Sequence, residues 1–348
     1  MVTFPSVIVA RATPGTLPHF PDAVRLADGR VLCAYRESTG HVRADGRVML
    51  VESADDGATW SKPRVAVDGE HDDRDPKLVQ LSDGTVLLSY FVLEWKAEAG
   101  RPFRVWGTYV VRSADGGRTW SAPVLVGGDQ MRWAVSHGAP VELPGGDLLL
   151  PVYGTDPERL LDPAAEVHVR DALKLERAVV VRSLDGGRTW PAETAAVVAS
   201  GHAFHFQEPT LTVLPDGGIV ALIRTTAKHA YLSRSADRGH TWSPPAETDL
   251  PASSHHVLTL GDGGVLVAYG DTSRRFSPRR NTVARVVPRP AETWNGWPDI
   301  ELYDSGHYDQ ANPSSVEIAP GRFLTIGFDV PHGTVVGVFS SRDDYPSS

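Results

Sequence analysis

The sequence predicts an all-β protein built as a six-bladed β-propeller, and two internal repeats carry this prediction. An eight-residue turn motif ending in tryptophan recurs along the chain, and a strand–turn–strand unit recurs in six copies. Neither repeat has the 3.6-residue periodicity of an amphipathic helix. A repeated unit that cannot bury both of its faces alone is typical of a closed ring of blades.

The turn motif reads Ser-x-Asp-x-Gly-x-Thr-Trp. Complete copies begin at Ser53, Ser113, Ser183 and Ser235, and a fifth survives only as Thr293-Trp294. In such a turn the Asp and Ser side chains accept backbone hydrogen bonds, Gly supplies a positive φ, and Trp buries a large surface. The motif therefore marks hairpins within the blades, and its aspartates are expected to be structural.

The second repeat supplies the inner strands of the blades. Its six copies run from Phe20 to Tyr35, Asp75 to Tyr90, Gly138 to Tyr153, Glu208 to Arg224, His255 to Tyr269 and Pro313 to Phe328. Short apolar runs bounded by Gly and Asp are typical of strands. We expect residues 1–348 to form one domain whose ring is closed by pairing of residues 7–10 with 335–340. Residues 157–175 read as an insertion in the third blade, partly helical.

Composition narrows the function classes. The net charge of −9 gives no electrostatic reason to expect nucleic acid as a partner. No run of about 18 apolar residues exists, so no membrane span is expected. The N-terminus lacks a basic start and an apolar stretch, which predicts a cytoplasmic protein, or a secreted one if a signal peptide has been removed. Cys33 is the only cysteine and reads as a core residue. The oligomeric state stays open.

The four turn motifs are Asp boxes, and with the six strand repeats they make essentially the whole chain resemble the sialidase superfamily, in particular bacterial proteins with Asp-box (BNR) repeats. This resemblance implies a propeller of sialidase type. The first strand of each blade then lines the axis, and its start opens into a funnel that also receives the end of the next strand. The residues that should converge there include Asp75, His137, Glu208, His255 and Asn312 from strand starts, and Arg36, Tyr153, Arg224 and Tyr269 from strand ends. The loop that carries His41, with Asp45 behind it, should overhang the opening.

The resemblance also implies chemistry. Sialidases clamp the substrate carboxylate with three arginines and use a Tyr nucleophile paired with a Glu, with an Asp as acid/base. Glu208, in Gln207-Glu208-Pro209, looks like the family's Glu, and Arg224 like one clamp arginine. Asp75 is the acid/base candidate, and the other clamp candidates are Arg36, Arg74 and Arg274. Asn312 stands where the Tyr is expected, and Tyr308 is the nearest tyrosine.

Three functions stay open. The first is an exo-acting glycoside hydrolase that takes a terminal acidic sugar of a glycan. The second is a propeller enzyme on another sugar, such as a uronate lyase or a deoxy-sugar hydrolase, in which His255 or His137 acts with Tyr153 or Tyr269. The third is a non-catalytic carbohydrate-binding propeller. No cofactor and no metal are expected, since the acidic run from His71 to Asp75 reads more simply as a solvated turn.

Overall fold

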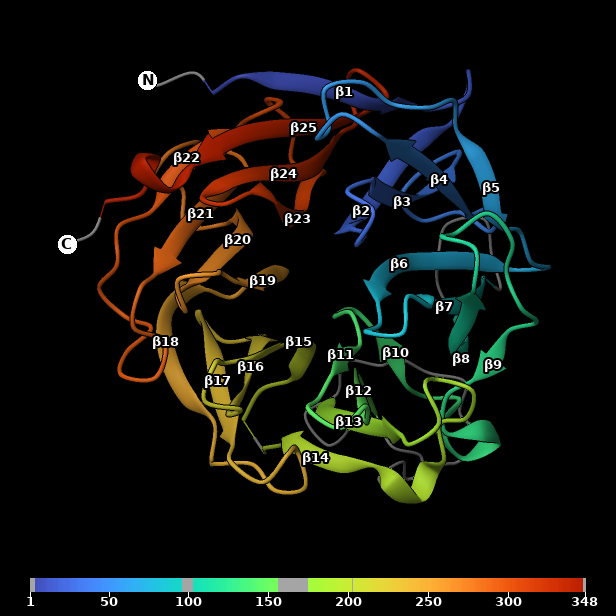
Figure 1. Cartoon of the computed structure of the whole chain (residues 1–348), viewed down its shortest axis with the longest axis vertical. Coiled ribbons are helices and arrows are strands. Elements are labelled where there is room, and N and C mark those ends of the chain that lie inside the picture. The colour runs from blue at the N-terminus through green and yellow to red at the C-terminus, as the bar shows by residue number, and fades with distance from the viewer. Residues whose placement is uncertain (1–3, 96–102, 156–174, 202, 347–348) are drawn as a thin grey trace.

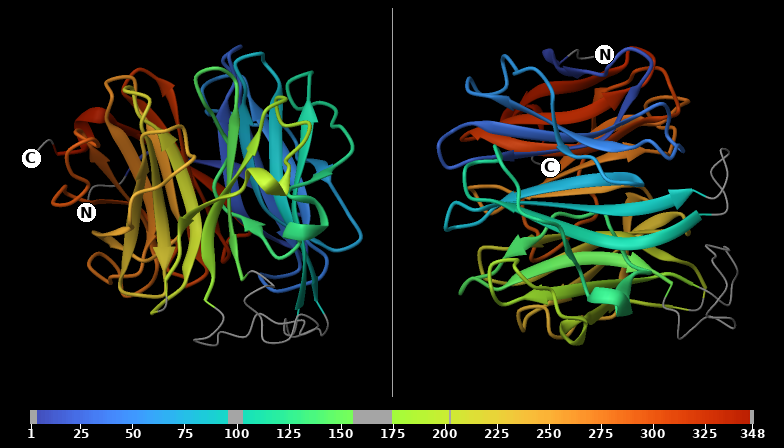
Figure 2. Two further views of the ribbon diagram at one scale, coloured as in Figure 1. Left: turned by 90° about the horizontal axis from the view of Figure 1, so that it is seen from below. Right: turned by 90° about the vertical axis from the view of Figure 1, so that its right-hand side faces the viewer.

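The computed structural model, which describes residues 4–95, 103–155, 175–201 and 203–346, is a ring of six antiparallel sheets around a central axis (Figure 1). Five sheets have four strands, and the third has five because its inner strand is split. In the side views the sheets stand face to face around the ring (Figure 2). The predicted six-bladed propeller is confirmed.

Each blade runs from an inner strand outward. Blade one comprises β2 (Leu17–Arg25), β3 (Val31–Ser38), β4 (Arg47–Ser53) and β5 (Arg64–Val67). Blade two comprises β6 (Asp72–Gln80), β7 (Val86–Trp95), β8 (Phe103–Ser113) and β9 (Val124–Leu125). Blade three comprises β10 (Val135–Ser136), β11 (Val141–Glu142), β12 (Leu148–Gly154), β13 (Arg177–Ser183) and β14 (Ala196–Ala199).

The second half of the ring repeats this plan. Blade four comprises β15 (Phe206–Val213), β16 (Ile219–Thr225), β17 (His229–Ser235) and β18 (Ala246–Pro251). Blade five comprises β19 (His255–Thr259), β20 (Val265–Asp271), β21 (Asn281–Val287) and β22 (Ile300–Tyr303). Blade six comprises β23 (Gln310–Ala319), β24 (Arg322–Asp329), β25 (Thr334–Ser341) and the N-terminal β1 (Ser6–Arg11). Short 3-10 turns occur at Gly128–Met131, Ala192–Thr194 and Arg342–Asp344.

The ring is closed by the N-terminal strand. β1 pairs antiparallel with β25, with Ser6 opposite Val338 and Arg11 opposite Thr334, as predicted (Figure 1). The described residues contain no α-helix, and none of their elements is a helix long and apolar enough to cross a membrane. The predicted partly helical insertion, apart from its last residue, lies outside the described residues.

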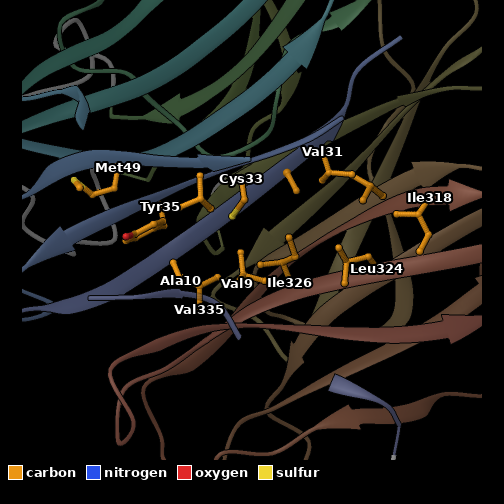
Figure 3. Close-up of a cluster of buried hydrophobic side chains, with 13 residues drawn as sticks. Val9, Ala10, Val31, Cys33, Tyr35, Met49, Ile318, Leu324, Ile326 and Val335 are labelled. Carbon is orange, nitrogen blue, oxygen red and sulfur yellow. The ribbon is translucent and has the colours of Figure 1, made fainter. Parts of the chain in front are cut away.

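The core lies between neighbouring blades. One cluster joins blades six and one and contains Val9 from β1, Cys33 from β3 and Leu324 from β24 (Figure 3). Cys33 is fully buried there, and burial raises the pKa of its thiol well above the usual value. The cysteine is therefore a core residue, as the sequence predicts.

The Asp boxes connect adjacent blades. In the first box Ser53 Oγ donates to Asp55 Oδ1 at 2.8 Å and accepts from the Gly57 N–H at 2.9 Å. A β-carbon at Gly57 would lie 2.6 Å from Leu324 Cδ2, on the second strand of the preceding blade. The other three boxes repeat this contact, pairing Gly117 with Leu32, Gly187 with Leu87 and Gly239 with Leu149. The box glycine thus lets each turn pack directly against the preceding blade.

This contact generates a stability prediction with a matched control. Gly57 and Gly84 both have positive φ, at 88° and 86°, but nothing lies within 4 Å of a β-carbon at Gly84. Gly84→Ala should lower the free energy of unfolding by about 1–2 kcal/mol through the left-handed backbone alone. Gly57→Ala should lower it by about 2–4 kcal/mol because Leu324 must also move. Denaturant titration measures both, and equal losses would contradict the inter-blade role.

Candidate active site

The inner strands of four blades share one backbone irregularity. Pairing slips between His19 and Asp22 in β2, and at the equivalent places in β6, β15 and β23. At each slip a residue followed by proline has positive φ: Phe20 (53°), Asp75 (47°), Glu208 (47°) and Asn312 (46°). Such values are uncommon outside glycine, and a bulge of this kind re-aims a side chain. All four residues line one pocket.

That pocket has a volume of about 390 Å³ and lies where the inner strands begin. Its charged and polar lining includes Arg74, Asp75, Glu176, His205, Gln207, Glu208, Arg224, Ser254, Arg280 and Asn312. Its apolar and aromatic lining includes Phe20, Phe91, Leu93, Trp95, Phe103, Val135 and Tyr153. A concave site with an aromatic wall and convergent charges is typical of a small-molecule pocket.

Glu208 is held as an anion. Arg224 Nη1 donates to its Oε1 at 2.7 Å, and Ser254 Oγ donates to its Oε2 at 2.6 Å. Burial alone would raise the pKa of Glu208, but the charges of Arg224 and His137 and the Ser254 hydrogen bond lower it to about 2. The carboxylate is therefore ionised at neutral pH and is a weak base.

His137 stands between two carboxylates from different blades. Its Nδ1 is 3.5 Å from Asp75 Oδ2, and its Nε2 is 3.9 Å from Glu208 Oε2. Burial opposes ionisation of Asp75, yet His137 and Arg74 lower the pKa of its carboxyl below the ordinary value. Contacts of this length commonly tighten when a ligand binds. The arrangement can carry a proton between the pocket and Asp75.

Arg280 differs from the other arginines of the pocket. Its Nη2 donates to Asn312 Oδ1 at 2.6 Å and to Ser253 Oγ at 3.4 Å, and both partners are neutral. Its Nε is buried and has no hydrogen-bond partner in the described part of the chain. Burial and the nearby Arg224 charge lower its pKa to about 10, so it remains a cation. A buried cation whose N–H is unpaired favours an anionic ligand.

Two further arginines are anchored by one aspartate. Arg74 Nη1 donates to Asp72 Oδ2 at 2.9 Å and to the His41 carbonyl at 2.9 Å. Arg36 Nε donates to the other oxygen, Asp72 Oδ1, at 2.6 Å. Only Arg74 of this pair lines the pocket, together with His41. Among the residues that the structure describes, Arg74, Arg224 and Arg280 are the arginines that line the pocket.

Tyr153 contributes a neutral phenol. It lies near the end of β12 and lines the pocket. Burial first, and then the charges of Glu208, Glu176 and Asp75, raise the pKa of Tyr153 well above its usual value. Glu176 lies beside His205, with 3.0 Å between Oε2 and Nδ1, and accepts a hydrogen bond from Gln207. The phenol can therefore donate a proton but is not ionised at neutral pH.

The sequence prediction places most of its residues here. Asp75, Glu208, His41, Arg74, Tyr153, Arg224 and Asn312 line the pocket, and His137 contacts it through Asp75 and Glu208. Arg280 and Glu176 were missed. Both lie at or just before the start of a third strand, β21 and β13, which the repeat did not include. No sequence signal singles out Arg280; the structure shows that Gly270 makes room for it, since a β-carbon there would lie 2.2 Å from Arg280 Nε.

Six of the predicted residues do not line the pocket. Two of them, Arg36 and Asp45, have structural roles. Arg36 is fully buried and donates to the carbonyls of Gly40 and Arg43, so it fastens the loop after β3. Asp45 accepts from the Thr39 N–H at 3.2 Å and caps the same loop. Neither side chain is free to reach a ligand in the pocket.

The other four lie in blade five or in the loop before blade six. Tyr269 donates to Asp299 at 2.7 Å and does not line the pocket. His255 packs against Tyr269 with ring centroids 5.6 Å apart; it does not line the pocket, although the charges of Glu208 and Arg224 act on it. Arg274 is exposed in the loop after β20. Tyr308 is 69% exposed in the loop before β23 and does not line the pocket. The structure corrects these placements: the inner strand of blade five, β19, has no bulge, and Arg274 and Tyr308 lie in exposed loops.

The chain is similar to known proteins in sequence and in fold. Residues 29–316 match a family model described as BNR repeat-like domain. A sialidase of Micromonospora viridifaciens is 28% identical over 257 residues, covering 67% of this chain and 37% of that protein. This chain thus spans little more than a third of that relative's length.

The similarity to solved structures covers nearly the whole chain. A Dyadobacter fermentans protein described as of unknown function has a TM-score of 0.81 at 25% identity, covering 96% of this chain and 97% of that one. Hadza microbial sialidase Hz136 has a TM-score of 0.72 at 16% identity, covering 95% and 66%. The intramolecular trans-sialidase of Ruminococcus gnavus has a TM-score of 0.71 at 14% identity, covering 98% of each chain. The last two show the fold alone.

The buried histidine of blade five generates a pH prediction. Burial lowers the pKa of His255 from 6.5 to about 3. Between those values the unfolded chain binds a proton that the folded chain excludes, so stability falls as pH falls, by about 1.4 kcal/mol per pH unit. His255→Phe should reduce this slope below pH 6.5 and leave the contribution of His256, whose pKa burial lowers to about 4, as measured by denaturant unfolding at several pH values. His240→Phe, at an exposed position, is the control. An unchanged slope in His255→Phe would refute the assignment.

Proposed function

The chain belongs to the family of BNR repeat-like domains, and on that premise we propose that it is a sialidase-like exo-acting glycoside hydrolase that binds the carboxylate of a terminal acidic sugar. The observation that carries the proposal is Arg280, a half-buried arginine of the pocket whose side-chain hydrogen-bond partners are neutral and whose buried Nε is unpaired among the described residues. Arg224 and Arg74 line the same pocket. Planar guanidinium groups are suited to holding a carboxylate through paired hydrogen bonds.

Pocket shape supports the exo-acting part of the proposal. A volume of about 390 Å³ suits one sugar unit rather than an extended chain. Trp95 and Phe103 form an aromatic wall, with ring centroids 5.1 Å apart, that can cover the apolar face of a sugar ring. The glycan beyond the terminal unit would then leave through the mouth of the funnel.

The proposed reaction separates the two carboxylates by role. Breaking the glycosidic bond builds positive charge on the sugar ring, and the ionised Glu208 stabilises it. Because Asp75 is ionised in the resting site, the proton for the departing oxygen comes from His137 and passes through Asp75. Water completes hydrolysis at the anomeric carbon and loses a proton to the same pair. Asn312 stands where the resemblance expects a nucleophilic Tyr, and an amide does not take that role, so Asn312 instead positions Arg280.

A second candidate function is elimination from a uronate, and the position of Tyr153 favours it. His137 and Tyr153 come from the paired blade-three segments β10 and β12 and their flanks. An imidazole could remove the proton beside the carboxylate, the C–O bond to the leaving group would break, and the phenol would donate a proton to that oxygen. The alternative pair, His255 with Tyr269, lies outside the pocket.

The anion site gives a test with a neighbouring control. Arg280→Gln should lower kcat/KM for a 4-methylumbelliferyl sialoside by about 10- to 100-fold, because a charged hydrogen bond is lost. Arg279→Gln, which changes the adjacent exposed arginine, should stay within about twofold of wild type. Equal rates for Arg280→Gln and wild type, or an equal wild-type rate on a neutral galactoside, would contradict carboxylate recognition.

The two reactions are separated by their products and by two variants. Hydrolysis releases fluorophore and should collapse by at least about 100-fold in Glu208→Gln. Elimination forms an unsaturated uronate, seen by ultraviolet absorbance with a uronate oligosaccharide, and should collapse in Tyr153→Phe by a similar factor. Binding of a sialoside or a uronate without either product would leave a carbohydrate-binding propeller as the function.

A further inference from the structure

A cluster of metal-ligating groups lies at the edge of the pocket, in segments far apart in the sequence. It consists of His19 on β2, His41 in the loop after β3, and Asp309 just before β23, and one potential ligand atom from each lies within 4.8 Å of the others. Asp309 Oδ1 is 2.8 Å from His41 Nδ1, and its Oδ2 is 3.3 Å from His19 Nε2. His41 and Asp309 are 268 positions apart, so the ring closure brings them together.

His19 is the unusual member of this cluster. Its side chain is fully buried, and neither ring nitrogen has a well-aligned hydrogen bond to any described residue. The ring is fixed by Phe20 and Phe328, with centroids 5.5 Å and 5.2 Å away. Its contact with Asp309 is long, and a buried imidazole without a well-aligned hydrogen bond is costly unless a ligand takes its lone pair.

The donor set matches a particular class of ion. Two imidazole nitrogens and one carboxylate oxygen are ligands that Zn²⁺ accepts, and three protein ligands leave a fourth position open. Donors around a tetrahedral ion with bonds of about 2.0–2.1 Å lie about 3.3 Å apart. The separations to the two oxygens of Asp309, 2.8 Å and 3.3 Å, are near this value, and the three ligand atoms lie within 4.8 Å of one another. Two arginines beside the cluster are already paired with Asp72: Arg36 at 2.6 Å, and Arg74, which also donates to the His41 carbonyl, at 2.9 Å. Arg280 is close enough for its charge to act on Asp309.

We propose that His19, His41 and Asp309 bind one Zn²⁺ ion per chain. The side chains of His41 and Asp309 are 42% and 26% exposed, which gives the ion a path from solvent. Because His41 lines the pocket, the ion joins the loop after β3 to the loop before β23 at the pocket wall. Its fourth position is then open to water or to a sugar oxygen. The inference departs from the expectation of no metal and is independent of the proposed reaction.

Zinc binding by the full chain tests the proposal without any sugar. After chelator treatment and its removal, equilibrium dialysis against ZnCl₂ with elemental analysis should give one tightly bound Zn²⁺ per wild-type chain. His41→Ala should weaken this binding by at least about 100-fold, since even outer-shell changes cost up to that factor. Cobalt replacement should give the visible absorption bands of a tetrahedral ion, and these should also disappear in His41→Ala.

A matched control separates this site from ordinary His–carboxylate pairs. His229 Nδ1 and Glu247 Oε1 are also 2.8 Å apart, but no third ligand joins this pair in the described part of the chain. His229→Ala should bind Zn²⁺ like wild type. Asp309→Asn, which keeps the shape of the side chain, should not bind the ion. This variant tests the proposal if His41→Ala does not fold. No stoichiometric binding by wild type, or equal binding by Asp309→Asn, would overturn the proposal and leave a carboxylate shared by two imidazoles.

Discussion

The pocket depends on a backbone constraint that recurs in four blades, a left-handed residue followed by proline near the start of the inner strand. Each such residue destabilises the fold by about 1–3 kcal/mol, so it is found only where surrounding contacts hold the backbone in this conformation. Here the proline removes a strand N–H that the bulge leaves without a partner, and the blades on either side fix the chain. The outcome is that Asp75 and Glu208, from blades two and four, face the same space.

Some charged groups in and around the pocket share a partner instead of forming isolated ion pairs. Asp72 divides its two oxygens between Arg36 and Arg74, which leaves one arginine for the loop and one for the pocket. Glu208 binds Arg224, whereas Arg280 receives only neutral partners. Small residues make this possible, because Gly46 and Gly270 leave room for the Arg36–Asp72 pair and for Arg280. The site therefore keeps an unmatched cation while most of its charges are compensated.

The sequence was sufficient for the fold because its Asp boxes and strand repeats are local signals. It also located Asp75, Glu208 and Asn312, since the start of each inner strand points to the funnel. It failed where side-chain direction depends on a bulge or a neighbouring loop. Tyr269 occupies the position that Tyr153 has in blade three, yet turns away to Asp299. Arg280 was out of reach because it comes from outside the repeat, and Tyr308 is exposed whereas the adjacent Asp309 faces inward.

The four bulges hold four different side chains, Phe20, Asp75, Glu208 and Asn312, in nearly the same backbone conformation. The conformation belongs to the strand and its proline, not to the chemistry of the side chain. Each blade therefore offers an interchangeable position, and one substitution can alter a single group of the pocket while the ring around it is unchanged. Substitutions at these four positions can therefore change the chemistry of the pocket one blade at a time, both in evolution and in protein engineering.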